Sequence, residues 1–387
     1  MKQRMYNTFY RYLKSALLAS ILSVAGYGVL KSLYGIYRFF LGRKSRMGVK
    51  ESRQALENLS PKPNMDYKIQ QQKIKKDLSI IVPAYNAEKT VKACIESVIN
   101  QKTEYDYELI VINDGSTDQT KEIIEHVNDE HLRVINQENR GFSGARNRGI
   151  DECFGRYIMF LDSDDMLVGD CIQRMMNQIE KYSADIIQGS YYSFIEGSEK
   201  KKDTRLEIEV IEEKSNKMVQ NPGFPWGKIY CRKLFEQIRF PLDVWFEDTI
   251  VCMLLYRMCK KMVVTDEIVY AYRLNQNGIT SKARHRKKCV DHYWVMEHIL
   301  EKSKQLGLPN DALQYELVRG HLSGLMYRRL SLQHAKVIES AFVLGCEMLN
   351  QIRPKDYICQ GNFIERDIEK AFREKNYKLW KVASFVV

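Results

Sequence analysis

The stretch LSIIVPAYN at residues 78–86 decides the fold. It is a continuous apolar run closed by a proline and an asparagine, which is typical of a strand buried on both faces of a parallel sheet. The segment EKTVKACIESVINQ at 88–101 follows with its apolar residues at helical spacing. Further runs of strand type at 107–114, 132–137 and 155–161 alternate with segments of helix type. This alternation predicts an α/β fold with a doubly wound, mostly parallel sheet.

Three carboxylates follow the last of these strands. Asp162, Asp164 and Asp165 come directly after the apolar run YIMFL, and carboxylates this close repel one another strongly unless a cation joins them. Oxygen ligands without His or Cys select Mg²⁺ or Mn²⁺, which usually share phosphate oxygens. A second interpretation stays open, in which Asp162 and Asp164 merely cap the next helix.

A second polar cluster ends the strand at 107–114. Asp114 stands at the strand end, where a carboxylate can accept a hydrogen bond from the N–H of a nucleobase, and Tyr85 can stack on that base. The alternative is that Ser116 or Thr117 of the NDGSTD segment caps the following helix. The chain has neither a GxxxxGK[ST] loop nor a GxGxxG turn between strand and helix, which excludes P-loop and dinucleotide-binding proteins.

The net charge of +11 is concentrated at the two ends of the chain. Residues 1–76 hold 16 Lys+Arg against 3 Asp+Glu, residues 77–284 hold 27 against 34, and residues 285–387 hold 17 against 12. The middle block is therefore acidic and a poor surface for a phosphate backbone, so nucleic acid is not expected as a partner. Nine cysteines without a CxxC pair predict reduced thiols in the cytoplasm.

The two ends differ in pattern from the middle. Residues 1–42 form a basic apolar segment that is short for a membrane span, and we expect a helix that lies on an anionic membrane surface or acts as a single anchor, with interfacial aromatic residues that include Tyr34. An amphipathic helix packed on the protein is the alternative. Residues 43–76 are polar and predict a linker. Residues 285–387 have helical periodicity and predict a domain that contacts the acceptor, a second copy of the chain or the membrane.

Four motifs in the middle block resemble those of family 2 glycosyltransferases with the GT-A fold. They are VPAYN at 82–86, NDGSTD at 113–118, NRGFSGARN at 139–147 and FLDSDD at 160–165. The likeness continues through three later segments, PWGKIYCRKLF (225–235), WFEDTIV (245–251) and YRLNQNGIT (272–280), and is similar to the bacterial polysaccharide and wall-polymer branch of that family. The resemblance covers roughly residues 77–284, which we take as the catalytic domain.

The resemblance implies roles on the donor side. Pro83, Tyr85 and Glu88 would hold the nucleobase and ribose, and Asp114 would bond the base ring nitrogen. Arg146 would lie near the nucleotide-sugar. Asp162 and Asp164 would form the DxD pair that binds Mn²⁺ or Mg²⁺, with Asp164 the more direct ligand, and Asp165 would hold the donor sugar or the loop.

On the other side of the sugar, the resemblance makes Asp248 the general base and Glu247 its supporter. An inverting displacement also needs groups that hold the departing diphosphate. Arg273 suits a bidentate clamp, and Thr280 or Ser281 can add a hydroxyl. Lys228 can contact donor or acceptor, and Trp226 can serve as a platform for an acceptor sugar, although a core position for Trp226 is an equal alternative.

Together these features predict a metal-dependent inverting glycosyltransferase at the cytoplasmic face of the membrane. It would move one sugar from a nucleotide-sugar, such as a UDP-sugar, to a cell-surface polysaccharide, a teichoic-acid-like polymer or a lipid-linked precursor. The QxxRW motif of processive synthases is absent, which favours single addition. The alternatives are a nucleotidyltransferase on a related sheet and a catalytically silent scaffold.

Overall fold

The computed structural model describes residues 44–198, 201–212, 216–275 and 283–387, together with Gly26, Gly28, Val29 and Ser32–Gly35. The chain separates into two compact units. Within the described residues, an α/β unit holds 63–275 and 301–308, and a helical unit holds 44–62, 283–300 and 309–387.

The α/β unit is built on one ten-stranded sheet in the order β3-β2-β1-β4-β9-β6-β10-β5, with β7 paired to β6 and β8 to β10. The neighbours β3, β2, β1 and β4 are all parallel, and β6 is parallel to β10. Strands β9, β5, β7 and β8 pair antiparallel with their neighbours. The strands are β1 (Lys76–Ala84), β2 (Tyr107–Asp114), β3 (Leu132–Gln137), β4 (Gly155–Phe160), β5 (Met166–Leu167), β6 (Ile186–Phe194), β7 (Lys201–Thr204), β8 (Glu209–Glu212), β9 (Lys228–Cys231) and β10 (Lys261–Arg273).

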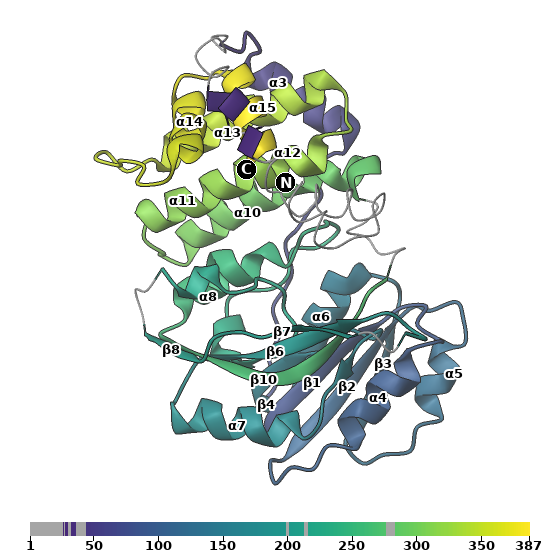
Figure 1. Cartoon of the computed structure of the whole chain (residues 1–387). Coiled ribbons are helices and arrows are strands. Elements are labelled where there is room, and N and C mark those ends of the chain that lie inside the picture. Colours follow the sequence, from purple (N-terminus) through teal and green to yellow (C-terminus); the bar gives the residue numbers. More distant parts are fainter. Residues whose placement is uncertain are drawn as a thin grey trace. The chain divides into compact units, whose positions relative to one another are not determined.

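Helices cover both faces of this sheet. Helices α4 (Val91–Ile99), α5 (Thr120–Glu125) and α7 (Cys171–Lys181) lie on one face, and α6 (Gly141–Glu152) lies on the other (Figure 1). The short helical segments of the unit are η2 (Met218–Gln220), η3 (Arg232–Phe235), the π-helical turn η4 (Val251–Leu255) and α8 (Tyr256–Met258).

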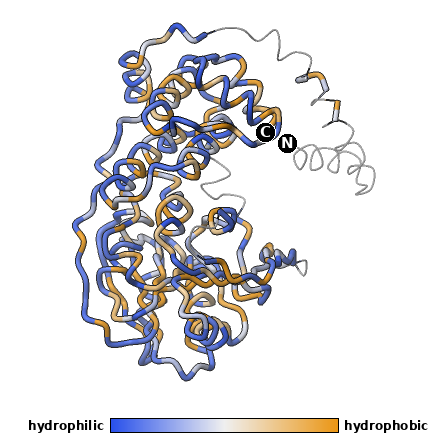
Figure 2. The backbone as a smooth tube through the Cα atoms, turned by 90° about the vertical axis from the view of Figure 1, so that its left-hand side faces the viewer, coloured by the Kyte–Doolittle hydropathy of each residue, from blue (hydrophilic) through white to orange (hydrophobic). Residues whose placement is uncertain are grey.

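Strand β1 is buried on both sides, as its continuous apolar run predicts. Its side chains Ile80 and Val82 join the core cluster that contains Cys94 and Ile95 of α4. On the opposite face, Gly149 of α6 approaches so closely that a Cβ there would lie 2.3 Å from the side chain of Ile81. Figure 2 shows the strands as an apolar band through this unit. The predicted α/β fold with a mostly parallel sheet is therefore confirmed.

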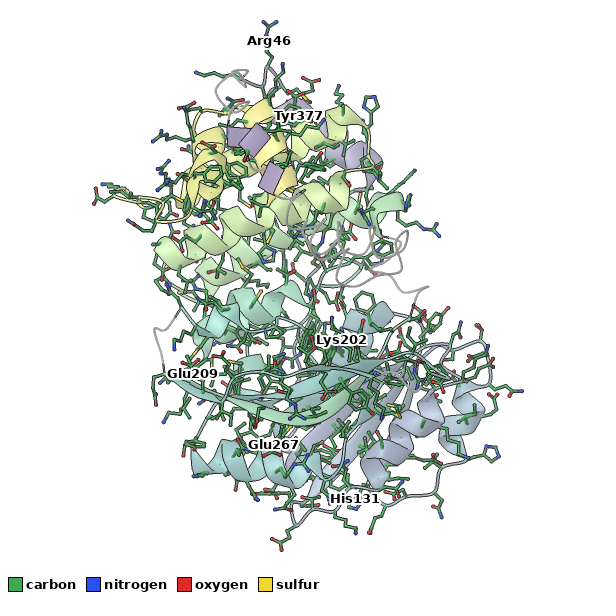
Figure 3. All side chains as sticks on the ribbon, viewed as in Figure 1. Arg46, His131, Lys202, Glu209, Glu267 and Tyr377 are labelled. Atoms are coloured by element: carbon green, nitrogen blue, oxygen red, sulfur yellow. The ribbon has the colours of Figure 1, made fainter. Side chains whose placement is uncertain are left out.

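The helical unit consists of α3 (Val49–Leu59), the part of α10 (Asp291–Gln305) up to Leu300, α11 (Ala312–Gly320), α12 (Met326–Leu330), α13 (Ala335–Ile352), α14 (Phe363–Arg373) and α15 (Tyr377–Val386), with the short segments η5 (Ala283–His285), η6 (Lys287–Val290) and η7 (His321–Leu325). Its core includes Trp294 and Trp380, both fully buried. A bridge between Lys44 and Asn376 joins the two chain segments near Arg46 and Tyr377, which Figure 3 labels at the same end of the unit.

The prediction of a linker over residues 43–76 is wrong for α3. This helix packs on α13, and its Leu56 is fully buried. Arg53 donates to both carboxylate oxygens of Glu297 at 2.8 and 3.1 Å. Because α3 has few apolar residues, its composition is that of a polar linker. It is nevertheless an amphipathic helix, and tertiary packing stabilises it.

Most of the predicted N-terminal helix over residues 1–42 lies outside the described residues. Tyr34, expected at a membrane interface, is instead buried, and its hydroxyl donates to Asp367 of α14 at 2.8 Å. Val29 and Leu33 are each 57 % exposed. Among the helices that the structure describes, none is both long and apolar enough to cross a membrane.

Candidate active site

The carboxyl ends of β1 and β2 bring the predicted base-binding residues together. The register pairs Pro83 with Ile112, so Tyr85 follows β1 where Asp114 ends β2. Tyr85 is half exposed. The Glu88 carboxylate already has a partner within the protein, because it accepts a hydrogen bond from the backbone N–H of Gln119 at 3.2 Å.

Asp114 has one satisfied oxygen and one unsatisfied oxygen. Its Oδ1 accepts from the Gln137 side chain at 2.7 Å and from the backbone N–H of Arg140 at 2.8 Å. Its Oδ2 is buried and has no hydrogen-bond partner. Leaving a buried acceptor unpaired costs roughly 1–3 kcal/mol. A donor N–H from a ligand would recover that cost, which fits the predicted contact with a base ring nitrogen.

The loop after β4 is anchored by Asp165. This carboxylate is almost fully buried and accepts from the Tyr270 hydroxyl and the Arg273 backbone N–H, both at 2.7 Å. Burial, reinforced by the charges of Asp162 and Asp164, raises the pKa of Asp165 to about 8. Asp165 therefore holds the loop against β10 and does not face an open site. Tyr270 was missed by sequence reasoning, although the alternation VYAYR in β10 is the pattern that places it.

Asp162 is bridged to Glu247 through a buried arginine. Arg146 of α6 donates to Asp162 Oδ1 at 2.8 Å and to Glu247 Oε1 at 2.6 Å. The Arg146 side chain is 7 % exposed, so both contacts are shielded from water. Burial raises the pKa of Glu247, and the guanidinium opposes that rise. Arg146 thus links the acidic loop to the segment that carries the predicted base.

Asp164 is the carboxylate of the loop that stays available. It is half-buried, and its side chain forms no hydrogen bond or ion pair with another residue that the structure describes. Burial and the neighbouring Asp162 raise its pKa, and the charge of Arg273 opposes that rise. The described residues contain no group of three or more His, Cys, Asp or Glu arranged to hold a metal ion. A Mg²⁺ or Mn²⁺ ion that takes one or two carboxylates and completes its shell with phosphate oxygens needs no such group, so Asp164 and Asp162 fit it.

The predicted base Asp248 follows a strained turn. Phe246 has φ 69°, a left-handed conformation that bulky residues rarely adopt, and it directly precedes Glu247. Asp248 is half-buried, and its carbonyl accepts from the Val251 N–H at 2.9 Å, which starts the helical segment η4. Nothing in the sequence predicts this strain, which fixes where Glu247 and Asp248 are presented.

Lys228 does not reach an open site. It is fully buried, and its ammonium donates to the carbonyls of Phe224 at 2.6 Å and Trp226 at 3.4 Å. Burial lowers its pKa well below the ordinary value, against the opposing influence of Cys252 and Asp248. The expected contact with donor or acceptor is therefore corrected to an internal position near Asp248.

Of the two interpretations of Trp226, sugar platform or core residue, the structure supports the core position. It is 7 % exposed and lies in the core cluster, stacked with Phe224 at 3.6 Å, Tyr270 at 4.5 Å and Tyr272 at 5.1 Å between ring centroids. A buried, stacked indole offers no open face to a sugar. Phe224 and Tyr272, which also stack on Trp226, are half-buried.

Arg273, the predicted diphosphate clamp, lies beside the loop after β4. Its Nε donates to the Asp164 carbonyl at 2.7 Å, and its guanidinium pairs with Glu196. The Arg273 side chain is 14 % exposed, whereas that of Glu196 is 76 % exposed. A diphosphate would have to displace Glu196 from Arg273. The predicted hydroxyls of Thr280 and Ser281 lie outside the described residues.

Comparisons with known proteins identify the family of the chain. The sequence model of "Glycosyl transferase family 2" matches residues 79–241. The chain is 32 % identical to glycosyltransferase GlyA of Streptococcus pneumoniae over 272 residues, which is 64 % of this chain and 39 % of GlyA. It is 30 % identical to glycosyltransferase GlyG of the same organism over 218 residues, which is 52 % of this chain and 72 % of GlyG. The chain therefore spans less than half of GlyA and about 62 % of EpsJ of Bacillus subtilis.

A solved structure shares the fold. S. aureus TarS 1–349 in complex with UDP-GlcNAc superposes with a TM-score of 0.63 at 22 % identity, covering 80 % of this chain and 90 % of that one. The family model and the curated relatives define the class as a glycosyltransferase. This chain belongs to glycosyltransferase family 2, and the resemblance seen in its motifs is confirmed.

Proposed function

We propose that the chain is a metal-dependent inverting glycosyltransferase that moves one hexose-type sugar from a UDP-sugar to a bacterial cell-wall or surface polymer. The observation that carries the proposal is Arg146, which joins the metal-side carboxylate Asp162 to Glu247 beside the base Asp248. The buried guanidinium of Arg146 thus connects the loop after β4, which would hold the donor, to the segment with Asp248, which would activate the acceptor.

Two relatives support the choice of donor and acceptor. TarS was crystallised with UDP-GlcNAc and with UDP. The poly(ribitol-phosphate) beta-glucosyltransferase of Bacillus spizizenii is 29 % identical over 212 residues, which is 52 % of this chain and 33 % of that enzyme. A polyol-phosphate polymer is therefore the acceptor class that we propose for this chain.

The reaction needs one proton transfer and one displacement. Asp248 takes the proton of an acceptor hydroxyl as its oxygen bonds to the anomeric carbon. The bond from that carbon to the diphosphate oxygen breaks, and the electron pair leaves with the nucleoside diphosphate. Arg273 binds the departing diphosphate after exchange with Glu196, and Asp114 orients the base. A divalent ion held by Asp164 and Asp162 would neutralise charge that develops on the leaving group.

A metal-supplemented binding screen of nucleotide-sugars tests this proposal. We expect one UDP-sugar to bind only with Mn²⁺ or Mg²⁺ and to be hydrolysed slowly without acceptor. Proton NMR of the first product formed from an α-linked donor should show a β-anomeric linkage. Binding that is indifferent to EDTA would contradict the metal role, and a retained α-linkage would contradict inversion.

We also propose that the chain works at the cytoplasmic membrane surface through residues 1–42. The exposed Val29 and Leu33 and the basic flanks favour this placement. Deletion of residues 1–42 should move the protein from the membrane fraction to the supernatant. A full-length chain that is wholly soluble in the same fractionation would contradict it. The helical unit is proposed to contact the acceptor or a second copy of the chain.

A further inference from the structure

A small pocket lies on the α/β unit outside the site described above. It has a volume of about 190 Å³, and its lining includes Lys68, Arg140, Arg148 and Asp151. One wall is α6, and the other is residues 63–75, which we call the strap. The strap is fixed to α6 because the Gln70 N–H donates to Asp151 at 3.1 Å.

The carboxylates of this pocket already have their own cations. Asp151 is buried and accepts from Arg239, also buried, at 2.6 Å. Asp66, the other acidic lining residue, lies 3.4 Å from Lys302. Neither carboxylate is therefore left to neutralise a cation of the pocket rim.

The basic residues are not balanced in the same way. Arg148 pairs with Glu152 at 2.9 Å. Lys68 and the Arg140 guanidinium are exposed, and neither forms a hydrogen bond or ion pair with another residue that the structure describes. The pocket therefore carries two uncompensated positive charges. Such a pair attracts a phosphate group, which a guanidinium binds through two parallel hydrogen bonds.

The volume limits what can enter. At roughly 30 Å³ per water molecule, the pocket holds about six waters. This is enough for a phosphate group with a few attached carbons and too little for a whole nucleotide-sugar. The pocket therefore fits one repeat of a phosphate-containing chain.

Its position links it to both halves of the site. The backbone N–H of Arg140 donates to Asp114, the predicted base contact, at 2.8 Å. Leu242, another lining residue, precedes Glu247 and Asp248 by a few residues on the same segment, and its N–H bonds to Met65 of the strap. An acceptor chain held here would run beside the segment that carries the base.

We propose that this pocket binds a backbone phosphate of a polyol-phosphate acceptor, with Lys68 and Arg140 as its ligands. The inference rests on the proposed function and adds a subsite that would set the position of the acceptor. Free inorganic phosphate has the same chemistry and should bind weakly at the same place, because it lacks the remainder of the chain.

Calorimetry on the full-length protein with a ribitol-phosphate oligomer, without donor, tests the subsite. Each of Lys68→Gln and Arg140→Gln should weaken oligomer binding about fivefold, and the double variant by more than tenfold. Millimolar inorganic phosphate should compete with the oligomer. Lys73→Gln is the matched control, since Lys73 is an exposed lysine of the strap outside the pocket lining. It should change the affinity less than twofold, and UDP affinity should not change in Lys68→Gln.

Three results of the oligomer titration would overturn the subsite: no oligomer binding by the wild type, unchanged affinity in the double variant, or equal weakening by Lys73→Gln. Competition between UDP and inorganic phosphate at this pocket would assign it to the donor and also overturn it. The assay needs no turnover. If the oligomer binds at the pocket but no sugar is transferred, the subsite stands and the proposed function is refuted. If sugar is transferred and the double variant has an unchanged KM for the oligomer, the proposed function stands and the subsite is refuted.

Discussion

The fold lowers the pKa of one carboxyl, that of Glu297 in the helical unit, and raises the pKa values of Asp164 and Asp165 in the α/β unit. In the helical unit, Glu297 accepts from Arg53 at 2.8 Å and from Lys62 at 2.7 Å. Burial alone raises the pKa of Glu297, but these hydrogen bonds outweigh it and hold the pKa below its ordinary value. In the α/β unit, the pKa values of Asp164 and Asp165 are both raised, first by burial and then by like charges.

The difference lies in whether the chain itself supplies cations that pair with the carboxylates. Glu297 has its cations built into the chain, so it stabilises the folded state with no ligand. In the loop after β4, Arg146 pairs with Asp162, and the charge of Arg273 only partly offsets that of Asp164, whose pKa stays raised. Perturbed carboxylates gathered at strand ends are the pattern of an active site.

The largest expected effect comes from the predicted base. Asp248→Asn keeps the shape of the side chain but cannot accept a proton, so kcat should fall by about 10³-fold. The Kd for the donor should stay within twofold, measured by titration with the UDP-sugar and Mn²⁺. Asp243→Asn is the control, because Asp243 is exposed on the same segment and its positive φ suits asparagine. Equal loss in both variants would remove Asp248 from this role.

Loss of the shared cation should cost stability as well as activity. Arg146→Met leaves Asp162 and Glu247 without their buried partner, and breaking such a pair costs roughly 3–5 kcal/mol. Urea unfolding of the metal-free protein should show this loss. Arg148→Met on the exposed side of α6 should change stability by less than about 0.5 kcal/mol. A small effect of Arg146→Met would mean that the two carboxylates are protonated or hydrated instead.

Asp164 should affect the donor without affecting the fold. Asp164→Ala removes the available ligand, and donor affinity in Mn²⁺ should fall by about 100-fold, while thermal stability without ligand stays the same or rises, because a repelling charge is gone. The adjacent Ser163→Ala should leave donor affinity unchanged. Donor binding that survives in Asp164→Ala and still depends on Mn²⁺ would place the ion on other residues.

The smallest effect is a pH dependence at Glu297. A carboxyl whose pKa is lowered by folding contributes stability above its unfolded pKa, near 4.3, and loses it as the pH falls through the folded pKa. Glu297→Gln should therefore cost about 1 kcal/mol at pH 7 and almost nothing at acidic pH. Urea titrations across this range measure it, with the exposed Asp356→Asn as control. A difference that does not shrink at low pH would contradict the ion-pair origin.

Sequence reasoning worked best where each strand carries its own motif. VPAYN and NDGSTD place Tyr85 and Asp114 at neighbouring strand ends, because parallel strands bring equivalent ends to one edge, and the register shows them there. It worked less well beyond β4. Lys228 is buried where β9 pairs antiparallel with β6, and Trp226 is buried beside Phe160 and against Tyr270, contacts that no local pattern reveals.

The sequence by itself determined the family, the sheet and the identity of the acidic loop, since these follow from apolar periodicity and from motifs within a few residues. The tertiary structure alone decided which charges meet. Arg146 and Glu247 are separated by 101 positions and share a hydrogen bond. Asp165 meets Tyr270 across 105 positions, and Lys68 and Arg140 line one pocket. Pairing over such distances depends on how the chain packs, because the strength of a charge contact is set by burial and geometry rather than by sequence spacing.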